Sequence, residues 1–170
     1  MVHNESDLDL FERILLATDG TVTDLVALYA GEPIRVKKLG QSVRSGDAPA
    51  ELGCGPQAAL LERRILLSGA QRDFLYAESL FVVDRLSAQT RARMLDSDRP
   101  IGLLWKEERL ETLREIVQRA VGPGGAIASH FGRTADAPFV RRSYLIHHDG
   151  RPLGRITEAW PKGGFPWPRR

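Results

Sequence analysis

Charged side chains that strand alternation directs into the protein are the residues of this chain most suggestive of chemistry. In residues 58–68, Arg63 falls on the face of a predicted strand that otherwise carries aliphatic side chains. In residues 152–160, Glu158 shares a face with Trp160. An ion left alone in an apolar interior costs several kcal/mol, so such groups are normally neutralised, paired or turned towards a ligand. Two inward charges on separate strands therefore suggest a small polar cavity.

Two further charges are predicted to point inward. Glu78 and Arg142 each share a face with apolar neighbours on their strands. A buried structural pair is the alternative interpretation of Arg63 and Glu158, and the pattern alone leaves it open. Four inward charges of balanced sign are more than a core needs, and the forked guanidinium of arginine suits a carboxylate. These residues therefore predict a site for a small carboxylic acid.

The elements predicted to position these residues are strands joined by hairpins, with helices inserted between them. Asp149-Gly150, between two alternating runs, is the strongest hairpin signal. Predicted strands cover residues 34–43, 59–67, 74–83, 139–147 and 151–160. Predicted helices run from Ser6 or Asp7 to about residue 17, from Thr23 to just before Gly31, from Ser87 to about residue 95, and for a short distance from Pro100. The arrangement predicts an α+β fold: one domain with helices packed on a single antiparallel β-sheet.

One segment, residues 107–121, is ambiguous. Its residue types have high helix propensity, and its apolar side chains recur at helical spacing. From the residues alone, a helix is the preferred interpretation.

Composition and charge narrow the class of protein. The 170 residues are 42% hydrophobic and 27% charged, with a formal net charge of +2, which is typical of a globular protein and too small to favour nucleic-acid binding. A single cysteine, Cys54, excludes an intrachain disulfide, and no apolar run approaches the roughly eighteen residues of a membrane span. We therefore expect a cytoplasmic protein, monomeric or homodimeric, without nucleic-acid or membrane partners.

Two motifs that suggest other chemistry do not support it. His147 and His148 are adjacent, so in a strand they point to opposite faces and cannot share a metal. Residues 14–24 look like the start of an aspartyl-phosphate phosphatase, but Ala17 stands where that motif has its nucleophilic aspartate. A turn between two helices is the preferred interpretation there. We expect a site without metal or cofactor.

Several motifs, in their order and spacing, resemble those of the chorismate pyruvate-lyases (4-hydroxybenzoate synthases). They are Leu-Glu-Arg-Arg-Ile-Leu-Leu at 61–67, Pro-Ile-Gly at 100–102, Arg-Arg-Ser at 141–143, and Asp-Gly-Arg-Pro-Leu-Gly-Arg-Ile-Thr-Glu-Ala-Trp-Pro at 149–161. The branch of the family that it most resembles also has Leu-Leu-Ala-Thr-Asp-Gly-Thr-Val-Thr at 15–23, Gly-Glu-Pro-Ile at 31–34 and Tyr-Ala-Glu-Ser at 76–79. The resemblance covers a core from about residue 10 to 161 and leaves residues 162–170 as a basic, Pro- and Gly-rich tail.

The resemblance implies a buried, metal-free site beneath helical flaps. It implies that Arg63 grips the ring carboxylate of chorismate with help from a backbone amide at or beside Ile101 and Gly102. It also implies that Glu158 meets the oxygen at the 4-position of the ring. Arg63 and Glu158 are therefore the candidate catalytic residues. The resemblance further implies a strand within residues 107–121, against the helical interpretation.

The chain departs from the better-known members of that family at Glu78, where they have an arginine lining the cavity. A second anion contact is therefore left unassigned. Glu78 and Arg142 remain candidate substrate-binding residues.

The predicted function is a metal-independent lyase that eliminates pyruvate from chorismate to give a hydroxybenzoate, with the 4-isomer preferred over the 3-isomer. One alternative is a non-catalytic small-molecule sensor domain of the same fold. Only about thirty residues precede the first predicted strand, too few for a DNA-binding domain, so a sensor requires a partner chain. The other alternative is an enzyme of secondary metabolism that acts on another chorismate-derived or aryl acid.

Overall fold

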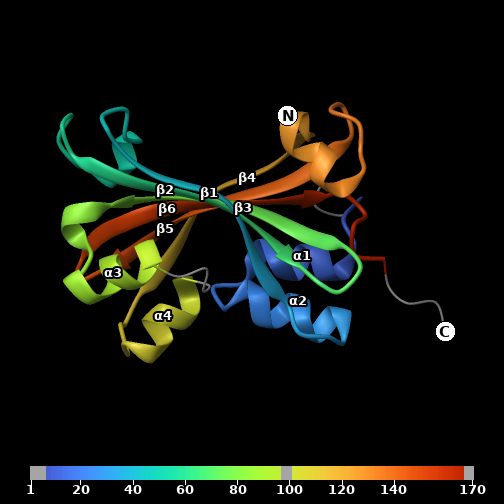
Figure 1. Cartoon of the computed structure of the whole chain (residues 1–170). Coiled ribbons are helices and arrows are strands. Elements are labelled where there is room, and N and C mark those ends of the chain that lie inside the picture. The colour runs from blue at the N-terminus through green and yellow to red at the C-terminus, as the bar shows by residue number, and fades with distance from the viewer. Residues whose placement is uncertain (1–6, 97–100, 167–170) are drawn as a thin grey trace.

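The computed structural model describes residues 7–96 and 101–166, which form a six-stranded antiparallel β-sheet with helices packed on it (Figure 1). The strand order is β1-β2-β3-β6-β5-β4, so two three-stranded units meet where β3 pairs with β6. The strands are β1 Arg35–Ser45, β2 Ala59–Ser68, β3 Asp73–Val82, β4 Leu113–Pro123, β5 Pro138–His148 and β6 Arg151–Pro161. The α+β class predicted from the sequence is confirmed.

The α-helices of the described residues lie on one face of the sheet, which we call the helical face (Figure 1). They are α1 Leu10–Ala17, α2 Val22–Ala30, α3 Ala88–Asp96 and α4 Ile101–Glu107. The opposite face, which we call the open face, carries the short 3-10 segments η2 Ala50–Leu52 and η4 Gly125–Phe131 towards its two ends. None of the described helices is long and apolar enough to cross a membrane.

Two apolar cores lie side by side between the helical face and the helices. The first packs α1 and α2 on the sheet, with Val26, Leu67 and Trp160 among its buried members. The second packs α3 and α4 on the same sheet, with Leu104 and Phe81 among its buried members. Burial of each large apolar side chain contributes about 1.5–3 kcal/mol, so each helix pair is held by its own set of contacts. A seam between the two cores therefore crosses the sheet.

The β5–β6 hairpin has a two-residue turn and a change of register. Asp149 and Gly150 have φ values of 49° and 71°, the left-handed conformation that Asp-Gly favours in hairpin turns. His148 pairs with Arg151 beside the turn, and the register then shifts by one residue at Leu153 on β6. Beyond this bulge the strands pair regularly.

The structure corrects the helical interpretation of residues 107–121. The segment contains β4, which pairs along its length with β5, as the family resemblance implied. As a strand at the edge of the sheet, β4 exposes apolar residues such as Leu113, which is 66% exposed. The apolar spacing that suggested a helix was therefore not the signature of a buried face, and pairing with β5 overrides local propensity.

Two predicted helix starts also differ from the structure. Helix α1 begins after Asp9 rather than after Asp7, and the other predicted cap, Ser6, lies outside the described residues. Helix α2 begins after Thr21, two residues earlier than expected, and ends at Gly31 in the left-handed conformation, as predicted. Ser87 caps α3, as predicted, and its hydroxyl accepts the backbone N–H of Thr90 at 3.0 Å.

The segment after β6 packs on α1 and α2 instead of extending away as a tail. Phe165 is 1% exposed and stacks among Phe11, Tyr29 and Phe74. The hydroxyl of Tyr29 donates to the carbonyl of Pro166 at 2.6 Å. The predicted boundary at residue 161 therefore omitted residues that belong to the first core, while residues 167–170 lie outside the described part.

Glu12 joins α1 to this segment from a buried position. Its carboxylate accepts the backbone N–H of Gly163 at 2.8 Å and that of Asp9 at 3.0 Å. The side chain is 1% exposed. Burial raises the pKa of Glu12 above its ordinary value, although the two backbone amides act in the opposite direction.

We expect Glu12→Gln to remove a pH-dependent component of stability. Because its folded-state pKa is raised, the folded protein favours the protonated form of Glu12. The stabilisation from this form is fully present below the unfolded-state pKa of about 4.3, and it is lost as pH rises through the folded-state pKa. The Tm of the wild type minus that of the variant should therefore fall as pH rises above about 4.3 and through the folded-state pKa of Glu12. Thermal unfolding measures this, with Glu51→Gln at an exposed position as the control. A constant difference across this range would contradict the prediction.

Candidate active site

A belt of polar side chains crosses the helical face along the seam between the two cores. This polar belt consists of Arg63 on β2, Ser79 on β3, Glu158 on β6 and Arg142 on β5, which are 2%, 9%, 5% and 0% exposed. The alternate positions on either side of each belt residue carry apolar side chains, one set from each core. The inward positions predicted for Arg63, Arg142 and Glu158 are thus confirmed.

A cavity of about 80 Å³ lies at the polar belt between α2 and α4. Its lining includes Arg63, Ser79 and Glu158 from the sheet. The helices contribute Thr21, Val22 and Thr23 at the start of α2, and Ile101, Gly102 and Trp105 of α4. Typical ligand pockets measure roughly 300–1,000 Å³, so this cavity is smaller than a usual ligand site.

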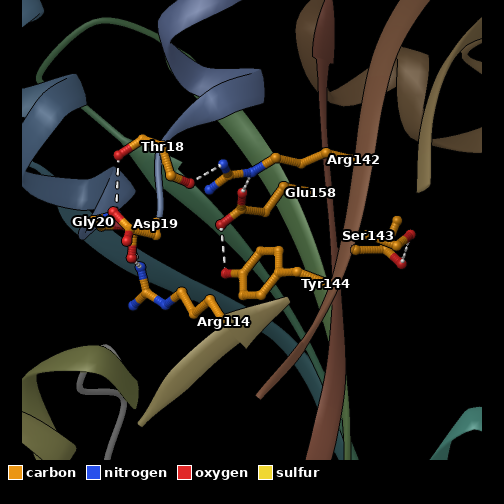
Figure 2. A network of polar contacts seen from close by, with 9 residues as sticks. Thr18, Asp19, Gly20, Arg114, Arg142, Ser143, Tyr144 and Glu158 are labelled. Carbon is orange, nitrogen blue, oxygen red and sulfur yellow. Dashed lines mark hydrogen bonds and ion pairs between the residues drawn. The ribbon is translucent and has the colours of Figure 1, made fainter. Parts of the chain in front are cut away.

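Two donors hold the carboxylate of Glu158 (Figure 2). Nε of Arg142 donates to Oε2 at 2.6 Å, and the hydroxyl of Tyr144 donates to Oε1 at 2.9 Å. Nη1 of Arg142 also donates to the carbonyl of Thr18 at 2.7 Å, in the loop between α1 and α2. Because a carboxylate has about four acceptor positions, two donors fix its orientation and leave capacity for a ligand.

Tyr144 remains a hydrogen-bond donor in this environment. Burial, and then the negative charge of Glu158, raise the pKa of Tyr144 well above its ordinary value, while Arg114 and Arg142 act in the opposite direction. Its hydroxyl therefore stays protonated at neutral pH and continues to donate to Glu158.

Arg114 connects β4 to the loop between α1 and α2. Its Nη1 donates to the carbonyl of Asp19 at 2.9 Å and to the carbonyl of Gly20 (Figure 2). Its Cζ lies 5.7 Å from the centre of the Tyr144 ring, within cation–π range. Arg114 also lines the cavity, so it brings a second guanidinium to the same space as Arg63.

The structure brings together four of the residues proposed for the site from the sequence. Arg63, Ile101, Gly102 and Glu158 all line the cavity. Arg142 does not contribute to this lining; it packs against Glu158 and fixes its carboxylate instead.

The inward orientation predicted for Glu78 is wrong. Glu78 is exposed on the open face, opposite Arg64 on β2. There it lines a larger hollow of about 650 Å³, which Arg63 and Ser79 also border, and its carboxylate accepts a hydrogen bond from the hydroxyl of Tyr76 at 3.3 Å. Both faces of β3 bury apolar side chains, including Tyr76 on one and Phe81 on the other, so alternation could not indicate which face held the cavity.

Sequence reasoning missed Arg114, Tyr144 and Trp105 as site residues. Arg114 lies in the segment predicted as a helix, where the alternation of a strand does not indicate which side chains point inward. Tyr144 shares a face with Arg142, and that alternation was the available signal for it.

Metal-ligand geometry is absent from the residues described. Among residues 7–96 and 101–166, no group of three or more His, Cys, Asp and Glu side chains is placed to hold a metal ion. His147 and His148 are engaged elsewhere, with Nε2 of His147 2.8 Å from Glu115 and Nδ1 of His148 2.9 Å from the carbonyl of Glu111.

Comparison with known proteins identifies the family. A family model described as "Chorismate pyruvate-lyase Rv2949c-like" matches residues 16–163. The chain belongs to this family. A chorismate pyruvate-lyase of Mycobacterium leprae (strain TN) is 33% identical over 164 residues, covering 93% of this chain and 77% of that protein. A chorismate pyruvate-lyase of Mycobacterium tuberculosis (strain ATCC 25618 / H37Rv) is 28% identical over 160 residues, covering 90% of this chain and 80% of that protein.

The fold also occurs in solved structures, among them a transcriptional regulator (GntR family) from Enterococcus faecalis V583, with a TM-score of 0.61 and 10% identity over 79% of this chain and 99% of that one. PhnF from Mycobacterium smegmatis matches with a TM-score of 0.69 and 14% identity, over 85% of this chain. The chain spans 65% of that PhnF structure. The isolated effector domain of PhnF matches with a TM-score of 0.67 and 14% identity, covering 84% of this chain and 88% of the domain. At this identity the likeness shows the fold that the family shares with these domains, and not a shared function.

We expect Tyr144→Phe to destabilise the protein, because it removes one of the two donors to a buried carboxylate. Hydrogen bonds to charged groups contribute about 1.5–3 kcal/mol, so the free energy of unfolding should fall by about that amount. Tyr76→Phe is the matched control, because its hydroxyl donates over the longer distance of 3.3 Å to the exposed Glu78. That variant should lose about 1 kcal/mol or less. Denaturant unfolding measures both, and equal losses would show that Glu158 does not depend on Tyr144.

Proposed function

We propose that the protein is a chorismate pyruvate-lyase that converts chorismate into 4-hydroxybenzoate and pyruvate. The observation that carries the proposal is the arrangement of Arg63, Glu158, Ile101 and Gly102 around one cavity. Membership of the family supports a lyase acting on chorismate. The choice of 4-hydroxybenzoate as the product rests on the proposed position of the ring, with its carboxylate at Arg63 and its 4-position at Glu158.

Arg63 and Glu158 have complementary roles in the proposed complex. The guanidinium of Arg63 binds the ring carboxylate in a forked arrangement, assisted by a backbone amide at or beside Ile101. The carboxylate of Glu158 accepts a hydrogen bond from the hydroxyl at the 4-position of the ring. A ring held at both ends by groups on different strands is fixed in orientation, which lowers the entropic part of the barrier.

The proposed reaction is an elimination that needs no co-reactant. The ether C–O bond breaks, and its electron pair leaves with the enolpyruvyl oxygen. The C–H bond at the neighbouring ring carbon, which bears the hydroxyl, supplies the electron pair that completes the aromatic ring. The released proton ends on the methylene carbon of the enol, which gives pyruvate. Aromatisation drives the reaction, so the protein has to position the substrate, hold its charge and manage one proton.

We assign the transfer of this proton to Glu158. Arg142 and Tyr144 donate to its carboxylate and hold it in one orientation, so it acts as an acceptor at the 4-position. Arginine supplies the positive charge for anion binding, and we therefore propose that the reaction proceeds without a metal ion.

A non-catalytic sensor is the second candidate, because the fold is that of regulator effector domains. A sensor would bind a small acid in the same cavity without turnover. Adding chorismate to the purified protein in a buffer with EDTA, and measuring pyruvate and the aromatic product chromatographically, separates the candidates. Binding without pyruvate release would favour the sensor, and release of 3-hydroxybenzoate would contradict the proposed product.

Arg63→Ala should weaken binding of 4-hydroxybenzoate, because it removes the forked contact to the carboxylate. Truncating one partner of a buried charge pair costs about 2–5 kcal/mol, so the Kd should rise by at least tenfold. The neighbouring Arg64 is exposed on the open face, so Arg64→Ala should change binding by about 0.5 kcal/mol or less. Calorimetric titration measures both variants. Similar Kd values for the two would remove Arg63 from the proposed site.

Glu158→Gln should lower kcat more than it weakens product binding. Glutamine retains the shape and one acceptor oxygen but cannot take up a proton, so a loss of about 10²–10⁴-fold in kcat is expected for a group in acid–base catalysis. The affinity for 4-hydroxybenzoate, titrated by calorimetry, gives the comparison. A variant with normal kcat and a lowered Tm would make Glu158 and its partners a structural cluster.

A further inference from the structure

The cavity presents two arginines from opposite parts of the sheet. Arg63 enters from β2 and Arg114 from β4, and three strands lie between them in the sheet. The third arginine of the site, Arg142, lies 2.6 Å from the carboxylate of Glu158, so their charges balance. The cavity is therefore lined by two guanidinium groups, whereas a hydroxybenzoate has a single carboxylate.

Arg114 is held at one end of its fork. Nη1 of Arg114 donates to the carbonyls of Asp19 and Gly20. Its Nη2 lies on the side of Gly102, where a Cβ built on that glycine would be 3.7 Å away. The guanidinium is a rigid fork with five donors, so anchoring one nitrogen on carbonyls sets the direction of the others. The anchored fork lies beside the α4 residues that line the cavity.

Arg114 is also more accessible than Arg63. Arg63 is 2% exposed, whereas Arg114 is partly exposed. Of the two cations, Arg63 therefore belongs to the deep part of the cavity and Arg114 to the part nearer solvent. A ligand with two carboxylates could place one on each.

We propose that Arg114 binds the second carboxylate of the substrate, the one on the enolpyruvyl group. The inference rests on the proposed lyase function, in which the substrate is a dianion. It supplies the second anion contact that Glu78, on the open face, does not provide. After the C–O bond breaks, this carboxylate belongs to pyruvate. Pyruvate then leaves from the more accessible cation, while the ring acid stays on the buried Arg63.

The two carboxylates give a direct test, because the substrate has both and 4-hydroxybenzoate has only the ring carboxylate. Arg114→Gln should raise the KM for chorismate by about ten- to a hundredfold, the loss expected for a hydrogen-bonded charged contact. The competitive Ki of 4-hydroxybenzoate should change by less than about twofold. Arg63→Ala should raise both constants. Equal effects of Arg114→Gln on both constants would overturn the proposal.

Thr18→Ala is the control for the other role of Arg114, which is to fasten the loop between α1 and α2. The hydroxyl of Thr18 accepts the backbone N–H of Gly20 at 2.9 Å, so this variant loosens the same loop and keeps the cation. The ratio of the chorismate KM to the 4-hydroxybenzoate Ki should stay at the wild-type value. A ratio that rises as in Arg114→Gln would assign Arg114 to holding the loop alone.

Failure of the lyase proposal can be told apart from failure of this inference. If the wild type releases no pyruvate, the same variants are titrated calorimetrically with chorismate and with 4-hydroxybenzoate. Selective loss of chorismate affinity in Arg114→Gln then upholds the second anion contact in a binding protein. Equal loss for the two ligands, or no binding of either by the wild type, overturns it.

Discussion

The site depends on the buried ion pair between Arg142 and Glu158. Either charge alone in this interior would cost several kcal/mol, so neither position is tolerable without the other. The pair forms because β5 and β6 place the two residues directly opposite each other, with 2.6 Å between Nε and Oε2. Since Arg142 also reaches the carbonyl of Thr18, the orientation of Glu158 is linked to the loop that leads into α2.

The division of the apolar interior explains where the cavity lies. Each helix pair is packed on its own core, and neither core extends across the polar belt. Polar side chains along the seam cost less than they would inside a continuous core, because they face one another and the cavity. The cavity lies at the same seam. The position of the buried charges and that of the cavity therefore have a common structural origin.

Alternation of side chains was informative where a strand has one distinctly polar face. On β2, Arg64 and Glu62 mark the face away from the helices, so Arg63 was correctly placed inside. On β3 both faces are largely apolar, so alternation did not distinguish them, and the predicted inward orientation of Glu78 was wrong. The sequence was sufficient to predict the fold class, the main hairpins and the inward positions of Arg63 and Glu158, the two residues at the ends of the proposed site.

The remaining features depend on contacts between distant residues. The strand β4 exists because β5 offers it a partner, and its local sequence favours a helix. Arg114 could be assigned to the cavity only once that strand was known. The burial of Phe165 likewise depends on aromatic side chains from α1, α2 and β3, which no pattern within the C-terminal segment indicates.

The bulge at Leu153 gives one inserted residue control over the chemistry of the site. If the register next to the turn continued without this bulge, Arg142 would lie opposite Thr157, and Glu158 would lie opposite Arg141. Directly opposed residues of an antiparallel pair share a face, so Glu158 would then join Arg141 and lose its partner in the interior. The number of residues between the turn and Glu158 therefore matters as much to the proposed site as the identity of the glutamate. A relative with every motif residue but a different count at this point would have its charges on the wrong sides of the sheet.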